Sequence, residues 1–275
     1  MPTNIAIGTQ ENHYMLSVCI ITKNEEHNLA RCLKSFQNTG FELVVVDTGS
    51  TDQTKKIATE YTKNIYDFTW CDDFSAAKNF AVSKATHPYV MVIDSDEYLQ
   101  KIDLSRSEKM IVEHSGEVGR IQRINIISGK DGKQENKEWI NRIFAKESFH
   151  YTGRIHEQVT AYDEKEYRTY EAPVFIGHTG YDLPKKEKKA KALRNIRLLE
   201  QELKNLGWDA KVHATQLEQS RIRMQSRNLK LRMQKKSSRS RIYCISLEKA
   251  ITWQKIITRH ASGSPMGSVM TLNQS

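Results

Sequence analysis

The chain has few cysteines, and their number and spacing argue against a disulfide-rich protein and against a zinc-binding protein. Its 275 residues include four cysteines, and no two of them form a C-x-x-C pair. Neither a disulfide framework nor a zinc site is indicated, and we expect buried free thiols. The four residues are Cys19, Cys32, Cys71 and Cys244.

Long apolar runs are also missing. The longest, residues 15–21, is interrupted by Ser17 and is far shorter than the roughly 20 apolar residues of a membrane-spanning helix. Residues 1–14 are polar and lack the basic start and apolar middle of a signal peptide. We therefore expect a disordered N-terminal arm over 1–14 and a cytoplasmic protein.

A net positive charge is absent from most of the chain, although the whole chain carries +9. Residues 207–275 hold 13 lysines and arginines against 3 acidic residues, which leaves 29 basic and 30 acidic residues in 1–206. The main domain therefore has no nucleic-acid footprint, and no nucleic-acid partner is expected. The basic tail predicts disordered sequence, with peripheral contact to an anionic membrane as the alternative.

Short apolar runs do occur, and they alternate with helical patterns over the first hundred residues. Residues 16–21, 43–46 and 89–93 are rich in valine and isoleucine, as expected for strands of a parallel sheet that is covered on both faces. Residues 64–68 predict a short further strand, and 73–85 predict a helix. The alternation indicates an α/β fold.

The pattern changes after Gly116. Residues 118–127 and 139–145 are β-rich and flank a glycine-containing turn, which predicts a hairpin and a mixed sheet. Residues 172–177 predict one more strand, and 185–206 predict a long charged helix.

These elements predict a mixed, mainly parallel sheet flanked by helices, with a helical or irregular C-terminal tail. The expected domain covers residues 15–206. Local signals in 207–275 disagree with one another, so the tail is expected to be partly disordered or truncated.

Closely spaced carboxylates follow the apolar run 89–93. Asp94, Asp96 and Glu97 come directly after this expected strand. Ligands bind beyond the carboxyl ends of strands in open α/β sheets, and clustered carboxylates there are costly unless a cation neutralises them. Hard oxygen ligands suit Mg²⁺ or Mn²⁺ beside a substrate phosphate. The alternative is a solvated acidic turn.

A second polar group ends another expected strand. Asp47 can accept a hydrogen bond from a nucleotide base or ribose, and Gly49 permits close approach or a positive φ. Thr22, at the end of the first strand, would lie in the same crevice. The alternatives are a turn-forming Asp47 and a helix-capping Thr22.

Three segments carry a family resemblance. Residues 16–26, 44–54 and 94–97 resemble the family 2 glycosyltransferases of the GT-A fold. Residues 141–144, 153–157 and 177–181 resemble a narrower branch, which includes lipopolysaccharide-core glucosyltransferases and sublancin-type peptide S-glycosyltransferases. The resemblance implies a Rossmann-like GT-A domain that moves a hexose from a nucleotide sugar, most simply a UDP-sugar, with inversion and with Mn²⁺ or Mg²⁺.

The resemblance also implies roles for individual residues. Asp96 would ligate the metal with Asp94 beside it, and Asp94 would also reach the sugar or ribose. His178 would be a further metal ligand or a structural histidine. Glu157 would be the catalytic base and His156 the second candidate, although the commoner family pattern is a Glu-Asp pair. The implied donor-binding residues are Thr22, Asn24, Glu25, Asp47, Gly49, Ser50, Lys78, Asp94, Arg142 and Arg154.

Some of these roles have plainer alternatives, and other functions compete. Lys78 could be a solvated helix residue, and Arg142 and Arg154 could form surface salt bridges. A catalytically silent nucleotide-sugar-binding module is the alternative function. A nucleotidyltransferase would want a Gly-rich phosphate loop, which residues 22–25 do not form. The acceptor (saccharide, lipid-linked glycan or peptide) stays open.

Overall fold

A computed structural model describes residues 16–129, 132–178, 193–195, 197, 198 and 201 of the chain. The packing of Cα atoms divides the chain into two units, Met1–Asp182 and Leu183–Ser275. The candidate site lies within the first unit.

The first unit alternates strands and helices before it becomes mainly β. Its elements are β1 (Leu16–Thr22), α1 (Leu29–Ser35), β2 (Glu42–Asp47), α2 (Thr54–Thr59), β3 (Ile65–Asp67), α3 (Phe74–Lys84), β4 (Tyr89–Asp94), β5 (Glu97–Ile102), α4 (Leu104–Glu113), β6 (Val118–Gly129), β7 (Gly132–Ala145), β8 (Phe149–Thr152), β9 (Gln158–Ala161) and β10 (Thr169–His178).

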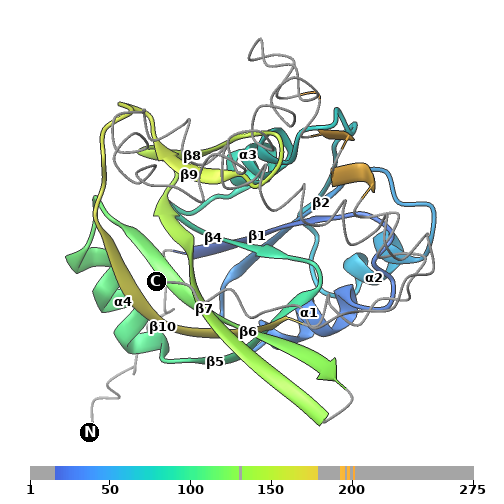
Figure 1. Cartoon of the computed structure of the whole chain (residues 1–275), viewed down its shortest axis with the longest axis horizontal. Coiled ribbons are helices and arrows are strands. Elements are labelled where there is room, and N and C mark those ends of the chain that lie inside the picture. Colours follow the sequence, from blue (N-terminus) through green and yellow to red (C-terminus); the bar gives the residue numbers. More distant parts are fainter. Residues whose placement is uncertain (1–15, 130–131, 179–192, 196, 199–200, 202–275) are drawn as a thin grey trace, which may run out of the picture. The chain divides into compact units, whose positions relative to one another are not determined.

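Eight strands form one mixed sheet (Figure 1), in the order β3-β2-β1-β4-β7-β6-β10-β5. The pairings β2–β3, β1–β2, β1–β4 and β6–β10 are parallel. The pairings β4–β7, β6–β7 and β5–β10 are antiparallel. The predicted fold class, a mixed and mainly parallel sheet flanked by helices, is confirmed.

Two apolar cores cover the two faces of this sheet, because successive side chains of a strand point to opposite faces. Val18 and Ile20 of β1 pack with α1 on one face. Cys19 and Ile21 pack on the other face with Ala77 of α3 and with β8 and β9. Figure 1 shows α3, β8 and β9 on the opposite side of β1 and β4 from α1 and α2.

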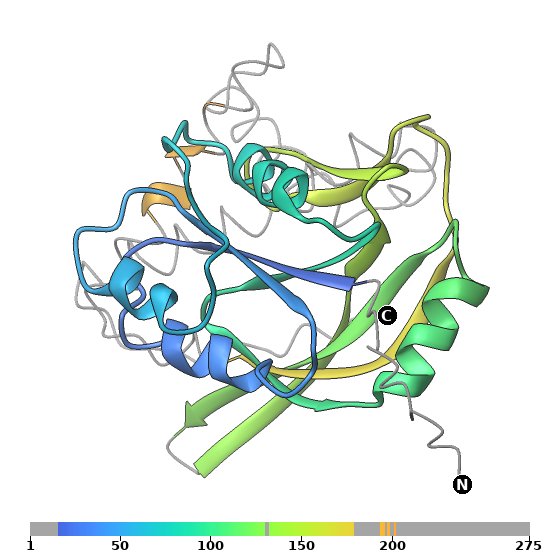
Figure 2. The same cartoon turned by 180° about the vertical axis from the view of Figure 1, so that it is seen from behind.

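The β6–β7 hairpin is the longest pairing in the sheet and extends to the pair Gly129 and Gly132. Seen from behind (Figure 2), its far end projects beyond the neighbouring strands. The strands β8 and β9 form a separate antiparallel pair. The predicted hairpin and the strands predicted near 16–21, 43–46, 64–68, 89–93 and 172–177 are confirmed.

Some expectations are wrong or lie outside the described residues. Cys19 and Cys32 are buried free thiols as predicted, but Cys71 is exposed, and Cys244 lies outside the described residues. Thr22 does not cap the first helix, because α1 begins seven residues later with Asn28 as its N-cap.

The C-terminal expectations are largely untested. Of the helix predicted over 185–206, the described residues 193–195, 197, 198 and 201 are helical, and the rest lie outside the described part. The expected arm 1–14 and tail 207–275 also lie outside it, so the domain bounds stay a prediction. Within the described residues, no helix is both long enough and apolar enough to span a bilayer.

Candidate active site

The carboxyl ends of three neighbouring strands bring the predicted polar groups together. In the register of the sheet, Thr22 of β1 lies opposite Asp47 of β2, and Ile21 lies opposite Asp94 of β4. Thr22, Asp47 and Asp94 therefore end adjacent parallel strands at one rim. Ligands of open α/β sheets bind at such a rim.

Two buried oxygens at this rim have no hydrogen-bond partner. Asp47 is 2% exposed, and its Oδ2 accepts from the N–H groups of Gly49 at 3.1 Å and Ser50 at 2.9 Å. Asp47 Oδ1 and Thr22 Oγ1 are also buried, and neither has a partner among the described residues. An unsatisfied buried polar atom costs about 1–3 kcal/mol, so a ligand that donates hydrogen bonds is favoured here.

Asn24, Glu25 and Ser50 join the loop after β1 to the loop after β2. The Asn24 N–H donates to Ser50 Oγ at 2.9 Å, and the Glu25 N–H donates to Thr54 Oγ1 at 2.7 Å. In return, the Thr51 N–H donates to Asn24 Oδ1 at 2.8 Å. Asn24 adopts a positive φ of 53° to make this contact. These residues therefore hold the two walls of the crevice together.

Gly49 has a conformation that other residues adopt at a cost. Its φ is +101°, and a Cβ added there would meet no atom within 4 Å. We expect Gly49→Ala to lower the free energy of unfolding by about 1–3 kcal/mol through backbone strain alone. Urea unfolding measures this loss. Gly116→Ala is the control, because Gly116 also has open space but no positive φ; equal losses in both variants would contradict the strain.

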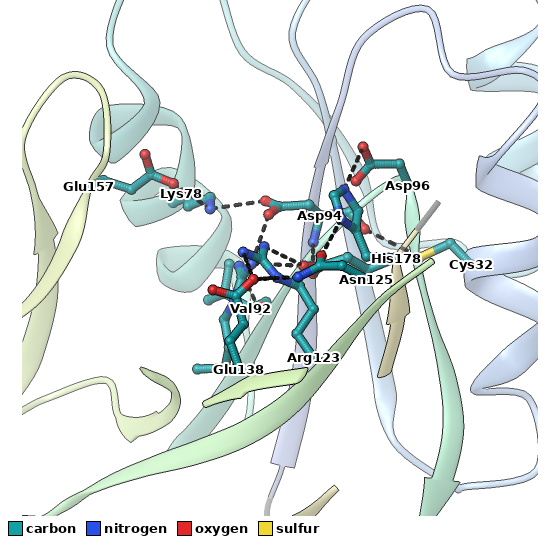
Figure 3. A network of polar contacts seen from close by, with 12 residues as sticks. Cys32, Lys78, Val92, Asp94, Asp96, Arg123, Asn125, Glu138, Glu157 and His178 are labelled. Carbon is teal, nitrogen blue, oxygen red and sulfur yellow. Dashed lines mark hydrogen bonds and ion pairs between the residues drawn. The ribbon is translucent and has the colours of Figure 1, made fainter. Parts of the chain in front are cut away.

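Lys78 bridges two of the predicted site residues. Its Nζ lies 3.0 Å from Asp94 Oδ1 and 2.5 Å from Glu157 Oε1 (Figure 3). The lysine is 3% exposed, so it is not the solvated helix residue of the alternative interpretation. Burial opposes its charge, but Asp94 and Glu157 outweigh burial and raise the pKa of Lys78. Lys78 therefore stays charged between the two carboxylates.

Arg142 extends this bridge into the sheet. One of its terminal nitrogens donates to Val92 O at 3.1 Å, and the other donates to Asp94 Oδ2 at 2.7 Å and to Glu97 Oε1 at 3.0 Å. Arg142 is 6% exposed and therefore forms a buried ion pair rather than a surface one. Burial raises the pKa of Glu97 even though Arg142 lowers it.

An alternating chain of acids and bases results. Arg123 lies 3.1 Å from Glu97 and 2.8 Å from Glu138. The complete series runs Glu138, Arg123, Glu97, Arg142, Asp94, Lys78, Glu157. We refer to these seven residues as the ion chain. It connects the β6–β7 hairpin with the loop between β8 and β9.

Asp96 and His178 face one another at the end of the same network. Asp96 Oδ2 lies 3.4 Å from His178 Nε2. Asn125 donates from Nδ2 to Glu138 at 2.6 Å, so its Oδ1 accepts from His178 Nδ1 at 2.8 Å. Because Nδ1 faces Asn125, Nε2 is the ring nitrogen that faces the Asp96 carboxylate.

The described residues hold no group of three or more His, Cys, Asp or Glu side chains placed to bind a metal. Sites for Mg²⁺ beside a phosphate commonly use only one or two carboxylates and take their other ligands from water and substrate. Asp96 and His178 fit a site of that kind. Asp94 is already bound by Lys78 and Arg142.

The loop between β8 and β9 holds the remaining predicted residues. Gly153 and His156 both have positive φ, 95° and 55°. His156 is exposed, and the Arg154 carbonyl accepts from the Phe74 N–H at 2.9 Å. This contact ties the loop to the start of α3, four residues before Lys78, and so supports the position of Glu157.

Four polar residues of the site were not predicted: Arg123, Asn125, Glu138 and Tyr151. The first three follow period two on the facing strands of the hairpin, and Arg123 lies directly opposite Glu138. Charged residues on one face of a predicted hairpin are a signal that could have found them. Tyr151 carries no such signal.

Comparison with known proteins identifies the family. The model of the family described as glycosyl transferase family 2 matches residues 17–164 of the chain. The chain belongs to this family. The predicted family and the predicted enzyme class, a glycosyltransferase, are thus confirmed.

This family 2 glycosyltransferase has partial relatives among curated proteins. Over 84 residues it is 45% identical to a TPR repeat-containing protein of Synechococcus elongatus, covering 30% of this chain and 21% of that protein. It is 25% identical over 205 residues to the SPbeta prophage-derived glycosyltransferase SunS of Bacillus subtilis, and the match covers 67% of this chain and 44% of that protein. The chain therefore spans less than half the length of these relatives.

Among solved structures, the glycosyltransferase is similar to the crystal structure of TarS from S. aureus. The TM-score is 0.44 at 19% sequence identity, and the match covers 68% of this chain and 39% of that chain.

Proposed function

We propose that this glycosyltransferase moves a hexose from UDP-hexose to an acceptor, with inversion at the anomeric carbon and with a bound divalent cation. The observation that carries the proposal is the pair of unsatisfied buried oxygens, Asp47 Oδ1 and Thr22 Oγ1, next to the carboxylates of Asp94 and Asp96. Hydrogen-bond acceptors and an anionic rim together suit a nucleoside diphosphate that brings its own cation.

The uridine end would bind at Asp47. Its free Oδ1 can accept from the imide N–H of uracil or from a ribose hydroxyl. The space beside Gly49, where an added Cβ meets nothing within 4 Å, supports close approach of a ligand to this backbone. Asn24, Glu25 and Ser50 would act by holding the two loops in place.

The diphosphate end would lie at Asp96 and His178, which would hold Mn²⁺ or Mg²⁺. Their facing atoms are 3.4 Å apart, and adjacent ligands of an octahedral ion lie about 3 Å apart. A cation bound here would act as a Lewis acid that neutralises charge on the departing diphosphate. Arg154 is the remaining candidate for contact with an anionic group.

The sugar would lie beside Asp94 and Glu157, because Lys78 fills the gap between the two carboxylates. Glu157 would accept the proton of the acceptor, which would attack the anomeric carbon on the face opposite the diphosphate. The bond from that carbon to the diphosphate oxygen would break, UDP would leave, and the configuration would be inverted. Lys78 contacts both carboxylates and would fix their separation. Arg142, whose terminal nitrogens are already bonded to Asp94, Glu97 and Val92, would orient Asp94 rather than bind diphosphate. His156 remains the second candidate base.

The test is Asp47→Asn, which keeps the size of the side chain. Its amide oxygen can still accept from Gly49 and Ser50, while an NH₂ donor replaces the free acceptor. We expect UDP affinity, measured by calorimetry with Mn²⁺, to fall about 10- to 100-fold, because ligand and protein would both present donors. Unchanged affinity would contradict the uridine site.

Asp67→Asn is the matched control. Asp67 lies opposite Asp47 on the neighbouring strand β3 but is exposed and pairs with Lys55 at 2.7 Å. We expect this variant to bind UDP as the wild type does. Binding of UDP without turnover of any UDP-hexose would favour the silent binding module.

The acceptor class (saccharide, lipid-linked glycan or peptide) is left open by this proposal. The cytoplasmic location and the contact with an anionic membrane stay predictions of the sequence.

A further inference from the structure

Tyr151 on β8 is held firmly beside the ion chain. The Tyr151 N–H donates to Asn79 Oδ1 at 2.8 Å, and Asn79 Nδ2 donates back to the Tyr151 carbonyl at 2.9 Å. Its ring centroid lies 5.4 Å from Lys78 Nζ and 5.6 Å from the Phe144 ring, which it meets edge to face. The side chain therefore has a fixed place between α3 and β7.

Unlike most buried hydroxyls, the Tyr151 hydroxyl makes no hydrogen bond within the part of the chain that the structure describes. The residue is 4% exposed, and its hydroxyl has no hydrogen-bond partner among the described residues. Burial raises the pKa of Tyr151 to about 12, so the phenol stays a hydrogen-bond donor at neutral pH. The ring itself lies beside the charged cluster, since its centroid is 5.4 Å from Lys78 Nζ.

Tyr167, in the same aromatic cluster, shows the usual arrangement. Its hydroxyl donates to the Val159 carbonyl at 2.6 Å and accepts from Asn141 Nδ2 at 3.3 Å. Leaving a buried hydroxyl unpaired is destabilising, and such a group calls for an explanation, of which a functional role is one. An unpaired buried donor of this kind suits an acceptor that a ligand supplies.

We propose that the Tyr151 hydroxyl donates a hydrogen bond to an oxygen of the transferred hexose and so helps to select the donor sugar. This inference rests on the proposed function, in which the sugar lies beside Asp94 and Glu157. Lys78 contacts both of those carboxylates and also lies over the Tyr151 ring. The hydroxyl would act on the sugar and leave the uridine and diphosphate contacts unchanged.

The experiment compares UDP with UDP-glucose, UDP-galactose and UDP-N-acetylglucosamine by calorimetry with Mn²⁺, for wild type and Tyr151→Phe. We expect UDP to bind both proteins equally, and the UDP-sugar that the wild type prefers to bind Y151F about tenfold more weakly. The melting temperature of unliganded Y151F should equal or exceed that of the wild type, because the variant removes an unsatisfied group.

Tyr167→Phe is the matched control, and we expect it to lower the melting temperature while leaving the ratio of UDP-sugar to UDP affinity unchanged. An unaltered ratio in Y151F, a lower melting temperature in Y151F, or an equal change of ratio in Y167F would overturn the inference. If the wild type binds neither UDP nor any of the three UDP-sugars, the proposed function itself fails. If the wild type binds UDP and a UDP-sugar, and Y151F binds both with the same affinities, the inference fails and the proposed function stands.

Discussion

Replacing Asp96 with asparagine should lower kcat/KM for manganese-dependent hydrolysis of UDP-glucose by about 10³-fold, the scale seen when a preorganised charge-stabilising group is removed. Asp96 ends the turn after β4 and faces His178 Nε2 at 3.4 Å. Asparagine keeps the size of the side chain but removes the charge that would hold the cation. Release of UDP, followed with and without Mn²⁺, measures the effect.

Two further variants complete this test. His178→Gln should cause a smaller loss, about 10- to 100-fold, because the charged ligand, Asp96, remains. Asp163→Asn is the control: Asp163 pairs with exposed Lys165 at 3.1 Å and should behave as wild type. Equal activity of D96N and D163N would remove Asp96 from the cation site.

Replacing Arg142 with methionine should lower the free energy of unfolding at pH 7 by about 3–5 kcal/mol, because the variant removes one of two counter-ions from buried Glu97 and from partly exposed Asp94. Arg142 contacts Asp94 at 2.7 Å and Glu97 at 3.0 Å, and Glu97 is 1% exposed. Methionine retains much of the side-chain volume, so lost packing contributes little. Urea unfolding with a free fit of the m-value measures the loss.

The pH dependence of this loss of stability distinguishes the contribution of the ion pairs from other effects of the substitution. Burial opposes ionisation of Asp94, but Arg142 and then Lys78 outweigh it and hold the pKa of Asp94 well below its usual range. A lowered carboxyl pKa stabilises the fold above the unfolded pKa of about 3.9, and this stabilisation is lost as pH falls through the folded value. The deficit of R142M should therefore shrink below about pH 4.

Arg168→Met is the control for this series. Arg168 pairs with Glu117 at 3.2 Å, but its side chain is 88% exposed, and exposed pairs contribute about 0–1 kcal/mol. A deficit for R142M as small as that of R168M would show that the ion chain does not stabilise the fold.

Local pattern was enough to predict the strands that position the site. The strands β1, β2 and β4 are buried on both faces, so their apolar runs stand out without knowledge of their neighbours. The polar residues that end them, Thr22, Asp47 and Asp94, follow from the same runs. The pattern predicts neither β5 nor α4, although Asp103 caps α4 through the Arg106 N–H and could have marked its start.

Long-range pairing explains what the sequence does not predict. The strand β5 has a mixed polar sequence and joins the sheet only beside β10, which is more than sixty residues away in the chain. That pairing brings Glu97 to Arg123 and His178 to Asp96. The role of Arg142 as a buried counter-ion depends on three strands at once, because Arg142 lies on β7, Asp94 on β4 and Glu97 on β5. The spacing of these residues in the sequence does not predict it.

Titration of the wild-type protein with UDP, in manganese and again after chelation, tests the central claim most directly. The rim formed by Asp47, Asp94 and Asp96 is proposed to bind a uridine diphosphate together with its cation. We predict saturable binding in manganese and at least about tenfold weaker binding after chelation. No binding in manganese, or the same affinity in both conditions, would contradict the account.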